Sequence, residues 1–355
     1  MIRGGKAIDG KRVLRLPGGL QMRTGNLLAG ACLVAAALAL AALATGLGLT
    51  DTGLADLFRT FAGESLPGAE NYALWTVRLP RILLGFMVGW AVALAGAMLQ
   101  SVARNPLADP GLFGFSQGSM TMIMLLLVFL PAAHKSLVVL AALAGGLTVA
   151  GLLLWLVGSE RSSGLSIVLM GIAIETVLSS FGSLLILYLP TETSIALSEW
   201  LAGSLFLANW TVIATFAPLF VLSLAAIFVL GPAMATYDLG SEMAMALGEP
   251  VGRSRPLILL TAVVLSSAAV TAVGPLVFLG VLAPHIAGFL SPAVARARLF
   301  LSALMGGILV LIADALTRGL GGSLPMPLGL SLTMVGVPLF IIALRLQALR
   351  KLQSH

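Results

Sequence analysis

Long uncharged stretches alternate with short polar ones along almost the whole chain. Each long stretch approaches the roughly 20 mostly apolar residues that a helix needs to cross about 30 Å of hydrocarbon. The pattern predicts ten membrane-spanning helices, near residues 27–49, 79–100, 111–131, 136–157, 165–189, 209–233, 256–273, 275–290, 299–316 and 328–344. We therefore expect an all-α, polytopic membrane protein.

The stretch from Pro256 to Leu290 decides the number of helices, because it contains no charged residue. As a single helix it would be about 52 Å long at 1.5 Å per residue, too long for one crossing. Gly274-Pro275 lies near its middle, and proline interrupts a helix because it lacks a backbone donor and clashes with the preceding turn. Two helices therefore fit this stretch better than one.

Basic residues are distributed unevenly between the two sides of these helices. If the N-terminus is cytoplasmic, most lysines and arginines fall on inner segments, as the positive-inside rule requires. The outer segments carry Arg59, Arg78, Arg81, Lys135 and Arg318. We therefore predict that both termini are cytoplasmic.

The same pattern divides the chain into three parts. We expect a basic cytoplasmic segment at 1–26, one ten-helix membrane domain at 27–348 and a cytoplasmic tail at 349–355. The first helix follows a long basic lead and is too long for a signal-peptide core, so we expect it to be retained.

Composition agrees with a membrane protein and argues against several chemistries. The 355 residues are 59% hydrophobic and 10% charged, against about 25% charged in soluble domains. The single cysteine and three scattered histidines give no metal-ligand spacing, and there is no phosphate-binding loop of the P-loop type. We expect no catalytic residues, no bound metal or cofactor, and no nucleic-acid partner, since the basic residues lie at helix ends.

Several motifs occur in a fixed order along the chain. RLPR at 78–81 precedes RNPLADPGLFG at 104–114, and these are followed by WLAGSL at 200–205, GPLVFLGVLAPHIAG at 274–288 and LPMPLG at 324–329. From about residue 78 to the C-terminus this order resembles the FecCD-type permease subunits of bacterial ABC importers for iron-siderophores, haem and vitamin B12. RNPLADPGLFG is the specific signal, whereas WLAGSL or LPMPLG alone would be weak.

The resemblance implies a permease in the bacterial inner membrane, surrounded by lipid and paired with a second permease copy, as a homodimer. Two separate ATPase subunits would bind ATP and Mg²⁺, and a periplasmic binding protein would deliver the cargo. An iron-siderophore complex is the expected cargo, with haem or vitamin B12 as alternatives. An ion-coupled secondary transporter is a more distant alternative, because Glu175 and Asp314 are its only candidate coupling groups in the membrane.

The inner segment 238–250 resembles the helices through which such permeases contact their ATPases. The residues expected to make this contact are Leu239, Gly240, Ala244, Leu247 and Gly248. An amphipathic helix lying on lipid is the alternative, but the segment lacks the basic residues that such helices usually carry.

Three outer arginines match the positions where the family binds its delivery protein. Arg78 and Arg81 are three residues apart, so they lie on one side of a helix start, and Arg318 lies at the outer end of a later helix. A guanidinium binds a carboxylate with a planar fork. Contact with lipid headgroups is the alternative.

The resemblance also suggests residues of the transport path or its gate. Asn105 and Leu107, together with Ser163 and Ser166, match places where the family narrows its path, although both segments could be plain turns. Glu175 lies near mid-bilayer, where a charge is costly, and the family more often has a small or amide residue there. It either is protonated or hydrogen-bonded between helices or lines the path and contacts substrate.

Overall fold

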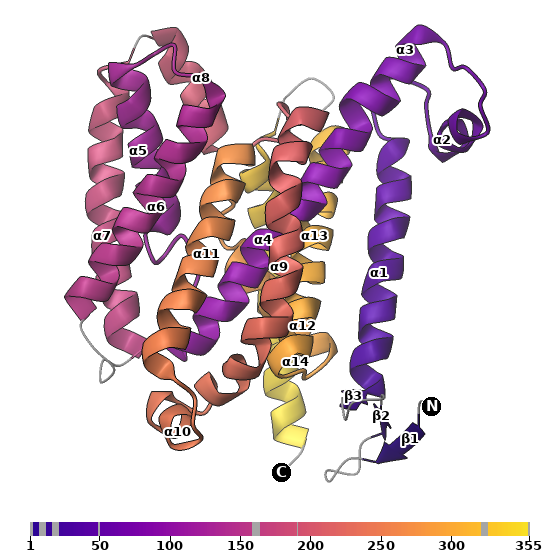
Figure 1. The fold of residues 1–355 in the computed structure, drawn as a ribbon. Coiled ribbons are helices and arrows are strands. Elements are labelled where there is room, and N and C mark those ends of the chain that lie inside the picture. The colour runs from indigo at the N-terminus through magenta and orange to yellow at the C-terminus, as the bar shows by residue number, and fades with distance from the viewer. Residues whose placement is uncertain are drawn as a thin grey trace.

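The computed structural model describes residues 3–6, 12–15, 21–48, 50–157, 164–189, 191–320 and 326–353. One long or apolar helix in these ranges corresponds to each predicted span, so the all-α membrane fold is confirmed (Figure 1). These helices are α1 (Thr24–Thr45), α4 (Leu79–Ala103), α5 (Phe115–Phe129), α6 (Lys135–Val157), α7 (Gly164–Ile186), α9 (Trp210–Tyr237), α11 (Val251–Val273), α12 (Leu279–Leu290), α13 (Ala295–Leu320) and α14 (Leu328–Gln353).

Eight of the described helices are long and apolar enough to cross a membrane, whereas α5 and α12 are shorter apolar helices. The break predicted at Gly274 is present, because α11 ends at Val273 and α12 begins only at Leu279. At the other end of the chain, α14 continues through the predicted tail as far as Gln353.

Short elements mark the two ends of the bundle. The helices α2 (Leu54–Phe61), α3 (Gly68–Asn71) and α8 (Thr191–Leu201) lie at one end, and a π-helical stretch, η1 (Tyr72–Arg78), connects α3 to α4. The helix α10 (Ser241–Ala246) lies at the opposite end, where both ends of the chain also lie (Figure 1). An even number of crossings explains this arrangement. Its orientation in the membrane remains a prediction, and we call the α10 end inner on that basis.

The N-terminal segment contains a small sheet that the sequence did not predict. Strands β1 (Arg3–Lys6), β2 (Arg12–Arg15) and β3 (Gln21–Arg23) pair antiparallel in the order β1-β2-β3. Val13 of β2 is buried, and β3 leads directly into α1. The sheet is too small to change the fold class.

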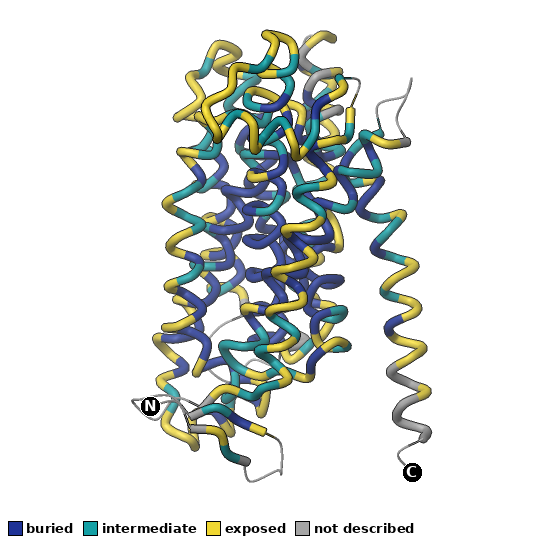
Figure 2. The backbone as a smooth tube through the Cα atoms, turned by 90° about the vertical axis from the view of Figure 1, so that its right-hand side faces the viewer, coloured by how far each residue is buried: buried dark blue, intermediate teal, exposed yellow. Residues whose placement is uncertain are grey.

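The buried residues of the chain gather along the middle of the bundle (Figure 2). In the helix α4 nearly every residue from Leu84 to Ala103 is buried. Glycines allow its neighbours to approach closely: a β carbon at Gly89 would overlap the carbonyl group of Gly306 in α13, and one at Gly96 would overlap Gly280 in α12. Small residues serve this purpose in membranes, where lipid provides no hydrophobic drive between helices. The helices α4, α12 and α13 thus form a close-packed core.

Backbone hydrogen bonds link two of the sequence motifs to each other and to the residue that precedes a third. The amide of Ser204 donates to the carbonyl oxygen of Val273 at 2.8 Å, and the amide of Leu328 donates to the carbonyl oxygen of Gly203 at 3.0 Å. Gly203 has a φ of 79°, a left-handed conformation that favours glycine. The WLAGSL segment therefore joins the end of α11 to the start of α14.

Candidate functional site

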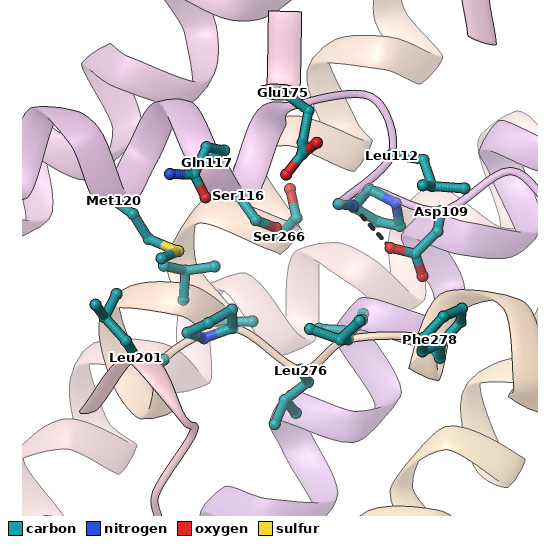
Figure 3. A pocket seen from close by; sticks show the side chains of 18 residues that line it. Asp109, Leu112, Ser116, Gln117, Met120, Glu175, Leu201, Ser266, Leu276 and Phe278 are labelled. Atoms are coloured by element: carbon teal, nitrogen blue, oxygen red, sulfur yellow. Dashed lines mark hydrogen bonds between the residues drawn. The ribbon is translucent and has the colours of Figure 1, made fainter. Parts of the chain in front are cut away.

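A cavity of about 360 Å³ lies between α4, α5, α7 and α11. Its wall is mainly apolar, and Figure 3 shows the side chains that surround it. The polar side chains on the wall are Asp109, Ser116, Gln117, Glu175 and Ser266. Among the described residues that line the cavity there is no lysine, arginine or histidine.

Two irregular backbone segments form much of this wall. Segment 104–114 connects α4 to α5, and segment 274–278 connects α11 to α12. Pro110 cannot continue a helix from α4, while Gly274 at φ 79° and Phe278 at φ 64° turn the second segment. Non-helical backbone at membrane depth is tolerated where it is buried in protein or lines a cavity. Both short helices therefore begin at the cavity.

Asp109 fixes the first of these segments against the second. Its side chain is only 5% exposed, and its Oδ1 accepts a hydrogen bond from the amide of Gly111 at 2.7 Å. Its Oδ2 lies against the first turn of α12, where a β carbon on Gly280 would be 2.6 Å away and the backbone amides of Gly280 and Val281 stabilise its charge. A helix N-terminus stabilises a nearby negative charge. The sequence analysis treated Asp109 only as part of a turn, although a carboxylate between two uncharged stretches was a usable signal.

Glu175 projects from α7 to the cavity wall and is half-buried (Figure 3). It forms no hydrogen bond or ion pair with any described residue. The interhelical hydrogen bond considered as one alternative is therefore absent from the described structure. The position agrees with the other alternative, a cavity-lining residue, and contact with cargo stays a prediction.

Three of the other predicted path residues, Asn105, Leu107 and Ser166, do not line this cavity. The amide of Leu107 donates to Asn105 Oδ1 at 2.9 Å, which closes a local turn, and the Leu107 side chain is exposed. Ser166 is exposed at the start of α7. Ser163 lies outside the described residues. A role in gating remains a prediction for these four positions.

At the outer end, two of the three predicted docking arginines bind one internal carboxylate. Arg81 Nε lies 2.5 Å from Asp314 Oδ1, and Arg318 Nε lies 3.0 Å from Asp314 Oδ2. The Asp314 side chain is only 1% exposed. This ion-pair cluster, consisting of Arg81, Asp314 and Arg318, connects α4 to α13.

Arg78 is also buried, with 4% of its surface exposed. Its guanidinium donates to the carbonyl oxygens of Thr45, Thr50 and Thr52, the last two at 2.7 Å, and so holds the segment after α1. These contacts are with the chain's own groups, so headgroup binding does not account for this arginine. Of the three, Arg81 keeps the largest exposed fraction, 18% of its side chain.

A glycine with a positive φ angle lies on each side of α10. Gly240 has a φ of 108° and Gly248 a φ of 87°, conformations that side chains rarely adopt. The side chain of Arg104, from the end of α4, lies against Gly240, about 3.0 Å from where a β carbon would stand. These two turns bracket the short helix at the inner end.

The two sides of α10 differ in a way that corrects the sequence analysis. Ala244 is completely buried against the protein, so it cannot contact a partner directly as predicted. Leu239, Met243 and Leu247 are exposed, at 57%, 51% and 59%. We call these three residues the α10 apolar face. A single buried alanine in a six-residue helix could not be recognised from the sequence.

An ion pair ties the base of α10 to the core. Arg298 of α13 lies 2.9 Å from Asp238 Oδ1 and donates to Gln100 Oε1 at 3.2 Å and to Ser101 Oγ at 3.1 Å. Asp238 directly precedes the α10 turn, and the other two partners belong to α4. The inner segment is therefore fastened to the same helices that meet at the outer ion-pair cluster.

Comparison with known proteins agrees with this architecture. The family model described as the FecCD transport family matches residues 32–346. An Fe(3+)-citrate import system permease of Bacillus subtilis is 36% identical, over 78% of this chain and 83% of the relative. A ferric enterobactin permease of Escherichia coli is 33% identical, over 84% and 89%. An iron(3+)-hydroxamate permease of B. subtilis is 31% identical, over 78% and 84%.

Other matches extend the range of relatives. A cobalamin import permease of Halobacterium salinarum is 31% identical, over 81% of this chain and 77% of the relative. Among solved structures, an inward-facing metal-chelate type ABC transporter superposes with a TM-score of 0.77 and covers 90% of this chain and 99% of that one. The two sequences are 24% identical, so the match to this solved structure shows a shared fold only.

Proposed function

The chain belongs to the FecCD transport family, and from this membership we propose that it carries a ferric siderophore from the periplasm to the cytoplasm. It is an ABC-transporter permease, a multi-pass protein of the bacterial inner membrane, and not an enzyme. The observation that carries the choice of cargo is that relatives at 31–36% identity are named for ferric citrate, enterobactin and hydroxamate. Haem and vitamin B12 are the alternatives, and the cobalamin relative favours the second of these.

ATP hydrolysis, with its ATP and Mg²⁺, is proposed to take place in two partner ATPase subunits that bind the α10 apolar face. Leu239 and Leu247 are more than half exposed at the inner end, outside the spanning helices. Exposed apolar surface marks a site of protein or membrane interaction, and segment 238–250 lacks the basic residues usual in helices that lie on lipid. A second copy of this permease would complete the membrane unit as a homodimer.

The distant alternative, ion coupling, is less well supported by the site. It requires ionisable groups in the membrane that are free to exchange an ion. Asp314 is paired with two arginines, which leaves Glu175 as the remaining candidate of the two considered.

Uptake into proteoliposomes tests the proposed function. We expect uptake of a radiolabelled ferric siderophore only when both permease copies, the ATPases, the binding protein and ATP are present. Uptake without ATP, driven by an ion gradient, would instead establish the secondary-transporter alternative. Uptake of vitamin B12 or haem, but no ferric chelate, would replace the proposed cargo.

A matched pair of variants tests the ATPase contact. Leu247→Glu should abolish copurification of the ATPase, because a charge would be buried in the apolar interface. Leu130→Glu is the control, since Leu130 is 54% exposed and lies after α5, at the outer end. Equal ATPase binding by both variants would contradict the proposed contact.

Docking of the binding protein through Arg81 and Arg318 is also a proposal, and the ion-pair cluster changes its test. An incoming carboxylate must compete with Asp314 for these arginines. In the fraction of molecules that stays folded, Asp314→Asn should therefore tighten binding of the delivery protein, whereas Arg81→Gln should weaken it and make it less sensitive to salt. If Asp314→Asn weakens binding as much as Arg81→Gln, the cluster is only structural.

A further inference from the structure

The cavity beside Glu175 has a marked imbalance of charge. Two carboxylates, Asp109 and Glu175, lie on its wall, and no described lining residue is basic. The N-termini of α5 and α12 at this wall contribute partial positive charge, roughly half an elementary charge each. With both carboxylates ionised, the wall is negative overall.

Only one of the two carboxylates is left without a partner. Asp109 is buried, and the backbone amides of Gly111, Gly280 and Val281 stabilise its charged form. Glu175 is half-buried and has no hydrogen bond or ion pair in the ranges that the structure covers. A partly buried carboxylate without a partner is costly, and a bound cation would reduce this cost.

The rest of the wall is suited to an aliphatic group. Leu112, Met120, Leu201, Leu276 and Phe278 surround the carboxylates. About 360 Å³ is at the small end of the roughly 300–1,000 Å³ range of ligand pockets. The cavity can therefore hold a flexible arm of a larger molecule, and not a whole ferric chelate.

A bare metal ion fits this site less well than an organic cation. No group of three or more histidine, cysteine, aspartate or glutamate side chains in the described chain could hold a metal. An alkylammonium group needs only carboxylate acceptors for its three N–H donors and an apolar wall for its methylene groups. The cavity offers both.

We propose that this cavity receives an aliphatic ammonium arm, so that the cargo is a ferric hydroxamate with a protonated amine and not an anionic citrate or catecholate complex. The proposal rests on the proposed function. Its chemical basis is charge balance: three singly charged hydroxamates neutralise Fe³⁺, and an amine arm adds one positive charge. Catecholates carry two negative charges each at the metal, and citrate adds carboxylates, so their complexes are anionic and would be repelled.

The test compares two cargos that differ only in this charge. A linear ferric trihydroxamate with a terminal amine and its N-acetylated, neutral derivative are supplied to the complete transporter in proteoliposomes. We expect the amine form to be carried about tenfold faster, the lower end of what a charge-assisted contact provides. Since the binding protein is the same in every assay, any change of this ratio between permease variants reports on the permease.

Three variants assign the preference to the cavity. Glu175→Gln should reduce the ratio to near one, because the amide keeps its size but cannot ionise. Glu175→Asp should retain most of the preference. Glu70→Gln, which makes the same charge change in α3 at the outer end, should leave it unchanged.

Two results would overturn the inference. One is equal transport of both forms by the unmodified protein, and the other is a preference that persists in Glu175→Gln. Faster transport of ferric citrate than of either hydroxamate would also reject it, while leaving the proposed function intact. If no ferric chelate of any class is carried, the proposed function fails and this inference fails with it.

Discussion

Replacing Asp314 by asparagine should destabilise the protein strongly, although the change is nearly isosteric. Asp314 is the only acidic partner of Arg81 and Arg318 in the described structure, at 2.5 Å and 3.0 Å. Without its charge, two guanidinium groups remain close together at the junction of α4 and α13. An amide oxygen can accept from one of them but provides no compensating charge.

The size of the effect follows from burial. Removing one partner of a buried ion pair costs about 3–5 kcal/mol, because the other charge is left uncompensated. The Arg81 side chain is 18% exposed and can be partly hydrated. We therefore expect a loss of stability at the lower end of this range, about 3 kcal/mol. That is roughly a hundredfold change in the folding equilibrium.

The ion pair of Arg59 and Glu64 provides the control. Its groups are 2.7 Å apart, but their side chains are 57% and 56% exposed, and exposed pairs contribute about 0–1 kcal/mol. Unfolding of the Asp314→Asn and Glu64→Gln variants is followed by tryptophan fluorescence during titration of detergent micelles with a denaturing detergent. If the two variants lose the same stability, Asp314 does not act as a buried counter-ion and the reasoning is refuted.

Three further predictions concern topology and packing. In a Cys32→Ala background, a cysteine at Met245 should react with an impermeant reagent only after the inner side is opened, and labelling of intact cells would reverse the orientation. Gly96→Val should reduce the yield of folded protein, because the added atoms overlap the backbone of α12, whereas Gly151→Val meets open space and is the control; equal yields would contradict this contact. Arg78→Gln should speed proteolysis of the segment after α1, since that segment loses most of the donors that hold its carbonyl groups; unchanged cleavage would show that it is held by other contacts.

The helices could be predicted from the sequence because their cause is local. An uncharged stretch of sufficient length must satisfy its backbone within itself in lipid, and the Gly274-Pro275 pair interrupts such a stretch wherever it occurs. The same reasoning could not foresee strands in the basic N-terminal segment. The alternation of apolar and polar residues that would predict a strand is weak there, because each strand is only three or four residues long.

The features that could not be predicted from the sequence depend on contacts between positions far apart in the chain. Arg81 and Asp314 are separated by 233 positions, so the sequence indicated a charged outer end but not that its arginines are already paired. Ala244 lies in α10 and Leu247 directly follows that helix, and only the position of α9 and α11 decides which of them is buried. Asp109 becomes a cavity residue only because α12 returns to α4.

The shortness of α5 and α12 has a consequence for how the protein is made. At 1.5 Å per residue they are about 22 Å and 18 Å long, less than the roughly 30 Å of hydrocarbon. Lipid alone therefore cannot hold either helix across the bilayer during synthesis. Each is held instead by its neighbours: α5 packs on α6 and α7, and α12 packs on α13 and α4. Gln100 of α4 fastens α12 further, because it donates to the carbonyl oxygen of Gly280, 180 positions later. We therefore expect both short helices to settle only by docking onto helices that already span the bilayer, so that a defect in α4 would leave α12 without its support.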